Sequence, residues 1–145
     1  MKNPDEQAGY LLTQAAFLRQ RVVNAALKEL DVTYIQFVIL AGTYELTAEG
    51  KVVTQQTIST ERRLDKAMVS NVIKTLISKR LLIRKVHPED KRAYTLSLTK
   101  AGTEKAIKGR MIASETDESF FRGIDKKTLS ESLSRILKND NEIYE

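Results

Sequence analysis

The stretch 65–92, DKAMVSNVIKTLISKRLLIRKVHPEDKR, contains two hydrophobic patterns with different periods. In its first half, apolar residues recur every three or four positions, which is typical of one face of an amphipathic helix. These residues are Val69, Val72, Ile73, Leu76 and Ile77. Asp65 precedes them and is a good N-cap, because its carboxylate can accept from unpaired N–H groups of the first turn. Lys79 and Arg80 follow in the expected last turn, where cations suit the helix dipole.

The second half changes to an alternating pattern. Residues 81–86 and 94–98 have a period of two, as expected for strands. Between them lies a charged segment whose Pro88 cannot donate to a strand ladder and belongs in a turn. A helix with a polar outer face, followed by a hairpin with a basic tip, is the layout of a winged helix. In that fold the second helix enters the DNA major groove, and the wing lies beside the backbone or in the minor groove.

Charge is distributed unevenly along the 145 residues. Residues 51–100 hold twelve Lys and Arg and four Asp and Glu, a net of +8, whereas the remainder holds twelve and fifteen, a net of −3. A basic middle between mildly acidic flanks places a polyanion-binding surface in the winged-helix segment. Scattered charge usually means only a solvated surface, but its coincidence with the winged-helix pattern favours a nucleic-acid partner.

Four sequence segments resemble those of the MarR family of bacterial transcriptional regulators. They are 64–76, 81–84, 88–93 (PEDKRA) and 96–102 (LSLTKAG). The most specific is the wing signature, D-x-R before a strand that ends in S-L-T-x-x-G. The resemblance is dense over 33–102 and weak in the flanks. It implies a mainly α fold with a small β-hairpin wing: a winged helix-turn-helix lobe at 33–100 within a single 1–145 domain.

The resemblance also implies which residues contact double-stranded DNA. The predicted set is Thr54, Lys66, Ala67, Met68, Ser70, Asn71, Lys74, Arg84, Asp90, Lys91 and Arg92. Ala67 and Met68 stand where the family often has Ser or Thr, so they offer apolar contact with a thymine methyl rather than hydrogen bonds. Met68 could instead fill the core.

In the wing, Arg92 matches the family arginine that inserts into the minor groove. Asp90 matches the acidic residue that fixes this loop, and we expect it to pair with Arg84. Lys91 and Lys85 are expected to make nonspecific phosphate contacts. The alternative is a tip that is merely solvated.

The expected turn between the third helix and the reading helix departs from the family pattern. Thr54 should cap that third helix, which runs to about Arg62. Arg63 stands where a glycine is common, and Arg62 stands where an apolar residue is expected. Because a C′ position often needs positive φ, which Arg tolerates less well, the turn is distorted or the helix ends early. Alternatively, both arginines reach phosphates.

Helices are also expected on both sides of this lobe. A first helix covers 5–30, and Thr33 with Gln36 forms a capping box that opens a second, nearly all-apolar helix. Residues 51–53 are expected to add a short strand to the hairpin sheet. Thr99 should cap a long helix, and Asp125 a final one. The long helix is expected to present a face of apolar or small residues, which are Ala106, Ile107, Met111 and Ser114.

In the resembled family, such terminal helices interlock between two subunits, so 5–30 and 100–145 are expected to be dimerisation helices. The alternative is that they cover one monomer. Family ligands are small aromatic acids and other amphipathic molecules that bind where these helices meet the DNA-binding lobe. Tyr34 matches a position that lines that cleft, and Arg19 could supply a counter-charge. Tyr34 could equally be an ordinary core aromatic.

Other functions find little support in the sequence. There is no cysteine, which excludes disulfides, thiolate metal sites and thiol redox switches. The one histidine, His87, lies beside a proline in the wing and is more typical of a surface residue than of a metal ligand. No phosphate loop, activated nucleophile or carboxylate pair indicates an enzyme, and no cofactor is expected. There is neither an apolar run of about 20 residues nor a signal peptide, so we expect a cytoplasmic protein without a membrane partner.

These observations predict a homodimeric regulator that binds a palindromic operator, acts as a repressor and is relieved by a small-molecule effector. Two alternatives remain. The first is a winged-helix DNA binder that responds to no ligand, and the second is a winged-helix module for protein–protein contact.

Overall fold

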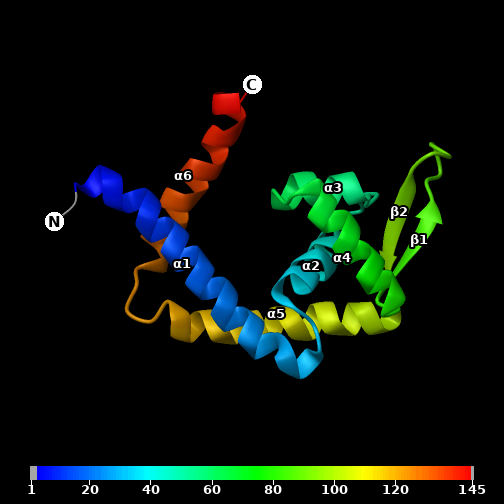
Figure 1. The fold of residues 1–145 in the computed structure, drawn as a ribbon, viewed down its shortest axis with the longest axis horizontal. Helices are drawn as coiled ribbons and strands as arrows, with labels where there is room; N and C mark the ends of the chain where they lie inside the picture. Colours follow the sequence, from blue (N-terminus) through cyan, green and yellow to red (C-terminus); the bar gives the residue numbers. More distant parts are fainter. Residues whose placement is uncertain (1–2, 145) are drawn as a thin grey trace.

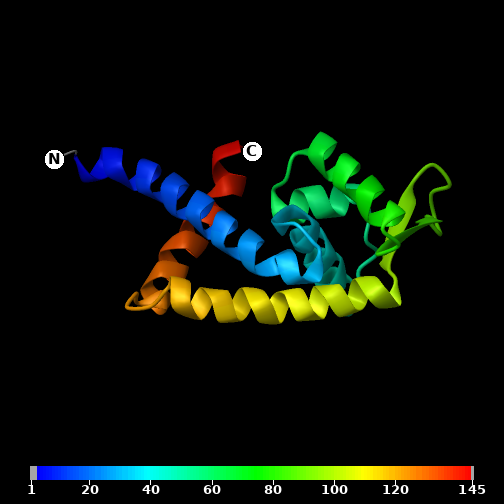
Figure 2. The same ribbon diagram turned by 60° about the horizontal axis from the view of Figure 1, so that its bottom comes forward.

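The long helix α5 (Lys100–Phe120) forms a base that connects two groups of elements (Figures 1 and 2). The structure is a computed structural model that describes residues 3–144, with side chains for 3–140. Helices α1 (Pro4–Ala26) and α6 (Lys126–Tyr144) stand over one end of α5. Over the other end lie α2 (Tyr34–Ala48), α3 (Gln55–Arg62), α4 (Lys66–Ser78) and the hairpin of β1 (Leu82–Val86) and β2 (Tyr94–Leu98). A short 3-10 turn, η1 (Leu27–Leu30), follows α1.

The helices begin where capping residues occur in the sequence. The predicted box is confirmed, because Thr33 Oγ1 accepts from the Gln36 N–H while the Thr33 N–H donates to Gln36 Oε1. The other predicted caps are also confirmed; they are Thr54, Asp65, Thr99 and Asp125. Each satisfies an N–H group that would otherwise lack a partner in the first turn.

Helices α2, α3 and α4 end in the same motif. After each, a residue with positive φ donates its N–H back into the last turn, and the next N–H bonds the carbonyl five residues earlier. These residues are Gly50, Arg63 and Arg80, with φ of 78°, 51° and 60°. Arg63 thus adopts the left-handed conformation, and the expected distortion of the turn is wrong. Helix α4 stops at Ser78, so the prediction that Lys79 and Arg80 lie in its last turn is wrong; Lys79 is its C-cap and Arg80 follows it.

The hairpin forms as predicted, with Leu82 opposite Leu98 and Val86 opposite Tyr94. The expected third strand at 51–53 is wrong, since the sheet has two strands. Only the Val53 carbonyl reaches it, accepting from the Leu96 N–H at 2.8 Å. Thr54 then begins the cap of α3, which turns the chain away before a ladder can form.

The core lies between α2, α4, α5 and the start of the hairpin. Its largest fully buried side chains include Leu27, Ile39, Leu40, Ile58, Ile73 and Leu76. Helix α5 faces this core with small residues, which are Gly102, Ala106, Gly109 and Ala113. Three of the four residues predicted for that face therefore lie away from this core, because Ser114 is exposed and Ile107 and Met111 are 42% and 59% exposed. Within the described residues, no helix is long and apolar enough to span a membrane.

Glycine is required where α5 begins. A Cβ added to Gly102 would lie 2.0 Å from the Leu81 carbonyl oxygen, which also accepts from the Thr99 N–H. The backbone at Leu81, which follows α4, can therefore approach the start of α5 this closely only because residue 102 has no side chain.

We predict that Gly102→Ala lowers the free energy of unfolding by about 1–3 kcal/mol, the usual cost of overpacking. Gly9→Ala is the matched control, because Gly9 lies within helix α1 and nothing lies within 4 Å of a Cβ added there. It should raise stability by about 0.5–1 kcal/mol through helix propensity. Urea denaturation at one protein concentration measures both, and a Gly102→Ala protein as stable as wild type would contradict this packing.

Candidate nucleic-acid interface

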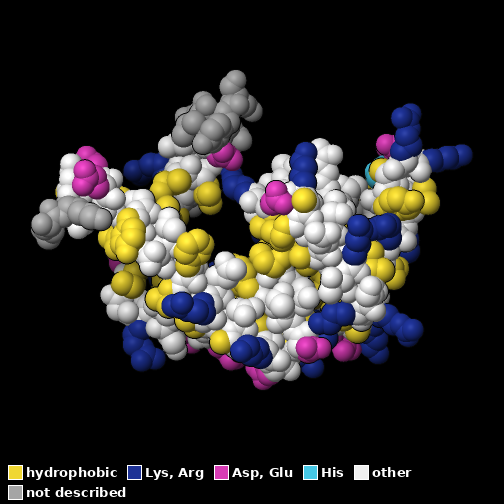
Figure 3. Space-filling view, viewed as in Figure 1, with side chains coloured by type: hydrophobic (Ala, Val, Ile, Leu, Met, Phe, Trp, Pro, Cys, Tyr) yellow, Lys and Arg dark blue, Asp and Glu magenta, His cyan; other side chains and the backbone are white. Residues whose placement is uncertain are grey.

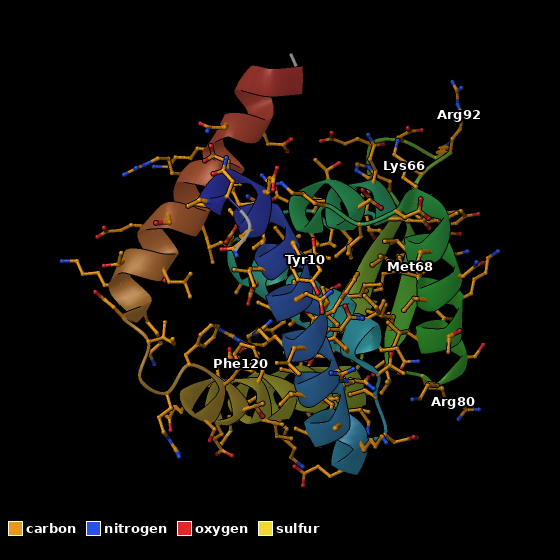
Figure 4. The ribbon with its side chains drawn as sticks, turned by 60° about the vertical axis from the view of Figure 1, so that its left-hand side comes forward. Tyr10, Lys66, Met68, Arg80, Arg92 and Phe120 are labelled. Carbon is orange, nitrogen blue, oxygen red and sulfur yellow. The ribbon has the colours of Figure 1, made fainter. Side chains whose placement is uncertain are left out.

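An open groove of about 580 Å³ lies between α3, the first half of α4 and the inner face of the hairpin. Six of the predicted DNA-binding residues line it; they are Thr54, Lys66, Ser70, Lys74, Arg84 and Asp90. Lys66, Ser70 and Lys74 recur at four-residue spacing, so they share the side of α4 that faces the wing. In Figure 4, Lys66 and Arg92 lie at the same end of this lobe, and Arg80 lies at the other end of α4.

The other predicted residues lie outside the groove. Ala67 and Asn71 are exposed on α4, and Lys91 and Arg92 are exposed at the wing tip. Met68 is half-buried, which leaves both interpretations of its side chain open. Sequence reasoning did not identify three polar residues of α3 that also line the groove; they are Gln55, Gln56 and Ser59. The only signal for them was their place directly after the Thr54 cap.

This face carries lysines and arginines of α4 and of the wing. Among the described residues, no ion pair involves the lysines and arginines of α4's outer face or of the wing, which are Lys66, Lys74, Arg84, Lys85, Lys91 and Arg92. Figure 3 shows some of these side chains projecting from the wing and the adjoining surface. Arg84 instead lies 5.2 Å from the centre of the Tyr94 ring, a cation–π arrangement.

The expected Asp90–Arg84 pair is therefore wrong. Asp90 Oδ1 instead accepts from the Arg92 N–H at 3.0 Å, a local turn that fixes the wing tip. His87 makes a second local bond, since its Nδ1 accepts from the Glu89 N–H at 3.1 Å. Within the described part of the chain, no group of His, Asp and Glu could hold a metal ion.

The two arginines of the α3–α4 turn are held by other helices. Arg62 donates to Glu45 of α2, and its buried Nε has no partner among the described residues. Arg63 Nε donates to Asp140 Oδ2 of α6 at 3.2 Å. Glu45 also faces Arg110 of α5, with 3.7 Å between Oε1 and Nε. From the sequence we expected a distorted turn, an early helix end or phosphate contacts for these two arginines. Their carboxylate partners were not expected.

A second hollow lies where α1, α2 and α5 meet the α3–α4 turn. This cleft of about 370 Å³ is lined by both Arg19 and Tyr34, with Glu45, Arg62 and Arg110 among the other residues. Arg19 already binds Asp117 through two bonds of 2.9 Å. These bonds and the carboxylate charge raise the pKa of Arg19, assisted by Tyr34 and opposed by burial. The positive charge of Arg19, which we expected to face a ligand, is thus largely neutralised by Asp117.

Comparison with known proteins gives a consistent result. The model of the MarR family matches residues 30–93. The chain is 37% identical over 138 residues to YdcH, an uncharacterized HTH-type transcriptional regulator of Bacillus subtilis (strain 168), with 94% of each chain covered.

Solved structures share the fold. A mutant MarR from E. coli in complex with operator DNA has a TM-score of 0.79 and 20% identity, covering 94% of this chain and 99% of its own. CouR from Rhodococcus jostii RHA1, bound to p-coumaroyl-CoA, has a TM-score of 0.80 and 19% identity, covering 96% and 94%. The winged helix, the fold match and the near full-length similarity to YdcH show that this chain belongs to the MarR family of DNA-binding transcriptional regulators, which are not enzymes.

Proposed function

We propose that this protein is a homodimeric repressor that binds a palindromic operator and releases it when a small aromatic or amphipathic ligand binds. The DNA-binding part of this proposal rests on one observation, which is the set of lysines and arginines around the groove between α4 and the wing. None of these cations has a carboxylate partner among the described residues. Unpaired cations on one face attract phosphates and release counterions on binding. Helix α4 enters the major groove in this proposal, and Ser70 and Asn71 reach base edges or phosphates.

The wing supplies a second kind of contact in this proposal. Arg92 at the tip inserts into the minor groove, where a narrow A·T-rich tract concentrates negative potential. Lys85 on β1 and Lys91 at the wing tip contact phosphates in this proposal. The local bond from the Arg92 N–H to Asp90 supports this role, because it orders the backbone that carries the arginine.

We predict that Arg92→Ala weakens operator binding by about 1–3 kcal/mol, roughly five- to 150-fold, since it removes a minor-groove contact. Lys85→Ala should cost only a few-fold and lower the slope of log affinity against log salt by about one, as expected for one phosphate. Gel-shift titrations at several salt concentrations, with a duplex that the protein selects from a random pool, measure both. Equal losses would count against the minor-groove role, and affinity independent of salt would favour a protein–protein module.

The dimer is supported by apolar side chains that the subunit leaves uncovered. Those on α1 that are at least 37% exposed are Tyr10, Leu11, Leu12, Phe17, Leu18 and Val22. Ile136 and Leu137 of α6 are 54% and 50% exposed. In Figure 3, apolar side chains gather on the part of the molecule formed by these helices. A patch of this kind usually marks an interface.

We predict that Leu11→Asp converts the protein to a monomer and lowers operator affinity at least about tenfold, because each subunit then contacts one half-site alone. Sedimentation velocity at micromolar concentration measures the change. Val52→Asp is the control for assembly, since Val52 is 53% exposed but lies in the winged-helix lobe, away from α1 and α6. A wild-type protein that sediments as a monomer would refute the dimer.

The ligand-relief part of the proposal rests on the cleft that contains Arg19 and Tyr34. A ligand there would touch α1, α2 and α5 together with the α3–α4 turn, so its binding can change the spacing of the two reading helices.

We predict that at least one phenolic acid in a thermal-shift screen raises the melting temperature of the wild type and releases the operator. Saturation at a hundred times Kd stabilises a protein by about 2.7 kcal/mol. Tyr34→Ala should reduce the shift, whereas Arg122→Ala, on an exposed residue outside the cleft, should not. The absence of any shift would favour a ligand-independent regulator.

A further inference from the structure

The α3–α4 turn contains an arginine in a backbone conformation that favours glycine. Arg63 has φ 51° and ψ 48°, and its N–H and that of Leu64 complete the hydrogen-bonded end of α3. Glycine adopts this conformation without a steric penalty, whereas an L side chain is strained there. The side chain of Arg63 should therefore make an interaction that glycine could not.

That interaction joins two parts of the molecule that are distant in the sequence. The Arg63 guanidinium donates from Nε to Asp140 Oδ2 at 3.2 Å and from a second nitrogen to the Leu137 carbonyl at 3.3 Å. Both acceptors lie in the C-terminal half of α6. Figure 1 shows this end of α6 rising opposite the end of α3 that leads into α4.

Helix α6 has few other connections to the DNA-binding lobe. Among the described residues, no other hydrogen bond or ion pair joins α6 to 33–98. The neighbouring arginine does not serve the same purpose, since Arg62 binds Glu45 of α2, within the lobe itself. The link between α6 and the reading helix therefore depends on one side chain.

We propose that Arg63 is a positioning residue for DNA binding, which ties the start of α4 to the end of α6. This inference goes beyond the proposed function and rests on its assignment of α4 as the reading helix. Two reading helices must fit half-sites about one helical turn apart, so their placement relative to the dimerisation helices matters. The tie restricts the orientations of the lobe in the free protein, and less order has to be imposed when DNA binds.

The expected effect is modest because the contact is half-exposed. The side chains of Arg63 and Asp140 are 49% and 42% exposed, and water and salt weaken such pairs. Loss of the tie should lower operator affinity about two- to fivefold, in line with one exposed ion pair.

The test is a double-mutant cycle with Arg63→Gly and Asp140→Asn in the full chain, read by fluorescence anisotropy on the selected duplex. Arg63→Gly removes the guanidinium but keeps the left-handed turn, so lower affinity cannot come from backbone strain. Each single variant should lose affinity within this two- to fivefold range, and the double variant should lose no more than Arg63→Gly alone, because that substitution already removes both bonds of the tie, including the one that Asp140→Asn weakens. Hydrogen exchange of the α6 amides near Leu137 should become faster in all three variants.

Arg135→Gln is the matched control. Arg135 is exposed on the same helix and has no ion pair among the described residues, so its loss should change neither affinity nor exchange.

Other results would overturn the inference. If Arg63 contacted a phosphate, only Arg63→Gly would weaken binding, and it alone would lower the salt slope by about one. Additive losses, or unchanged affinity in both single variants, would also overturn it. In each of these cases, wild-type protein that still binds the duplex as a dimer leaves the proposed function intact.

Discussion

The close approach of α5 to its neighbours is the contact on which the rest of the structure depends. Gly102 lies against the Leu81 carbonyl, and Gly109 lies against the ring of Phe37, so that a Cβ at either position would be too close. These two glycines let one helix carry the hairpin and α4 at one end and α2 in its middle. The same helix continues beneath α1 toward α6, so it connects the two groups of elements.

Ion pairing differs between the groove beside the wing and the cleft that contains Arg19. On the groove face the cations have no carboxylate partner in the part of the chain that the structure describes, whereas in the cleft Arg19 binds Asp117 and Arg62 binds Glu45. A paired arginine fixes the position of a helix, while an unpaired one is available to a polyanion. The basic residues of this chain therefore serve two purposes, which net charge alone does not distinguish.

The fold could be predicted from the sequence wherever the cause was local. Caps such as Thr33 and Asp65, and the alternating strands of the hairpin, depend on neighbouring residues and were confirmed. Tertiary contacts account for the errors: α2 packs against the glycine face of α5, which leaves Met111 exposed. For the candidate site, the groove residues followed from the motif, but Asp90 was assigned a partner across the hairpin and instead bonds its own turn. The carboxylate partners of Arg62 and Arg63 come from helices that sequence spacing could not place beside them.

The central claim is that two copies of one basic lobe, held at a set distance by helices of the same chains, contact DNA together. Selection of bound duplexes from a random pool, followed by sequencing, tests it most directly. The account predicts enrichment of an inverted repeat whose half-sites lie about one helical turn, roughly 10 base pairs, apart. Enrichment of a single unrepeated half-site, or none even in dilute salt, would contradict it.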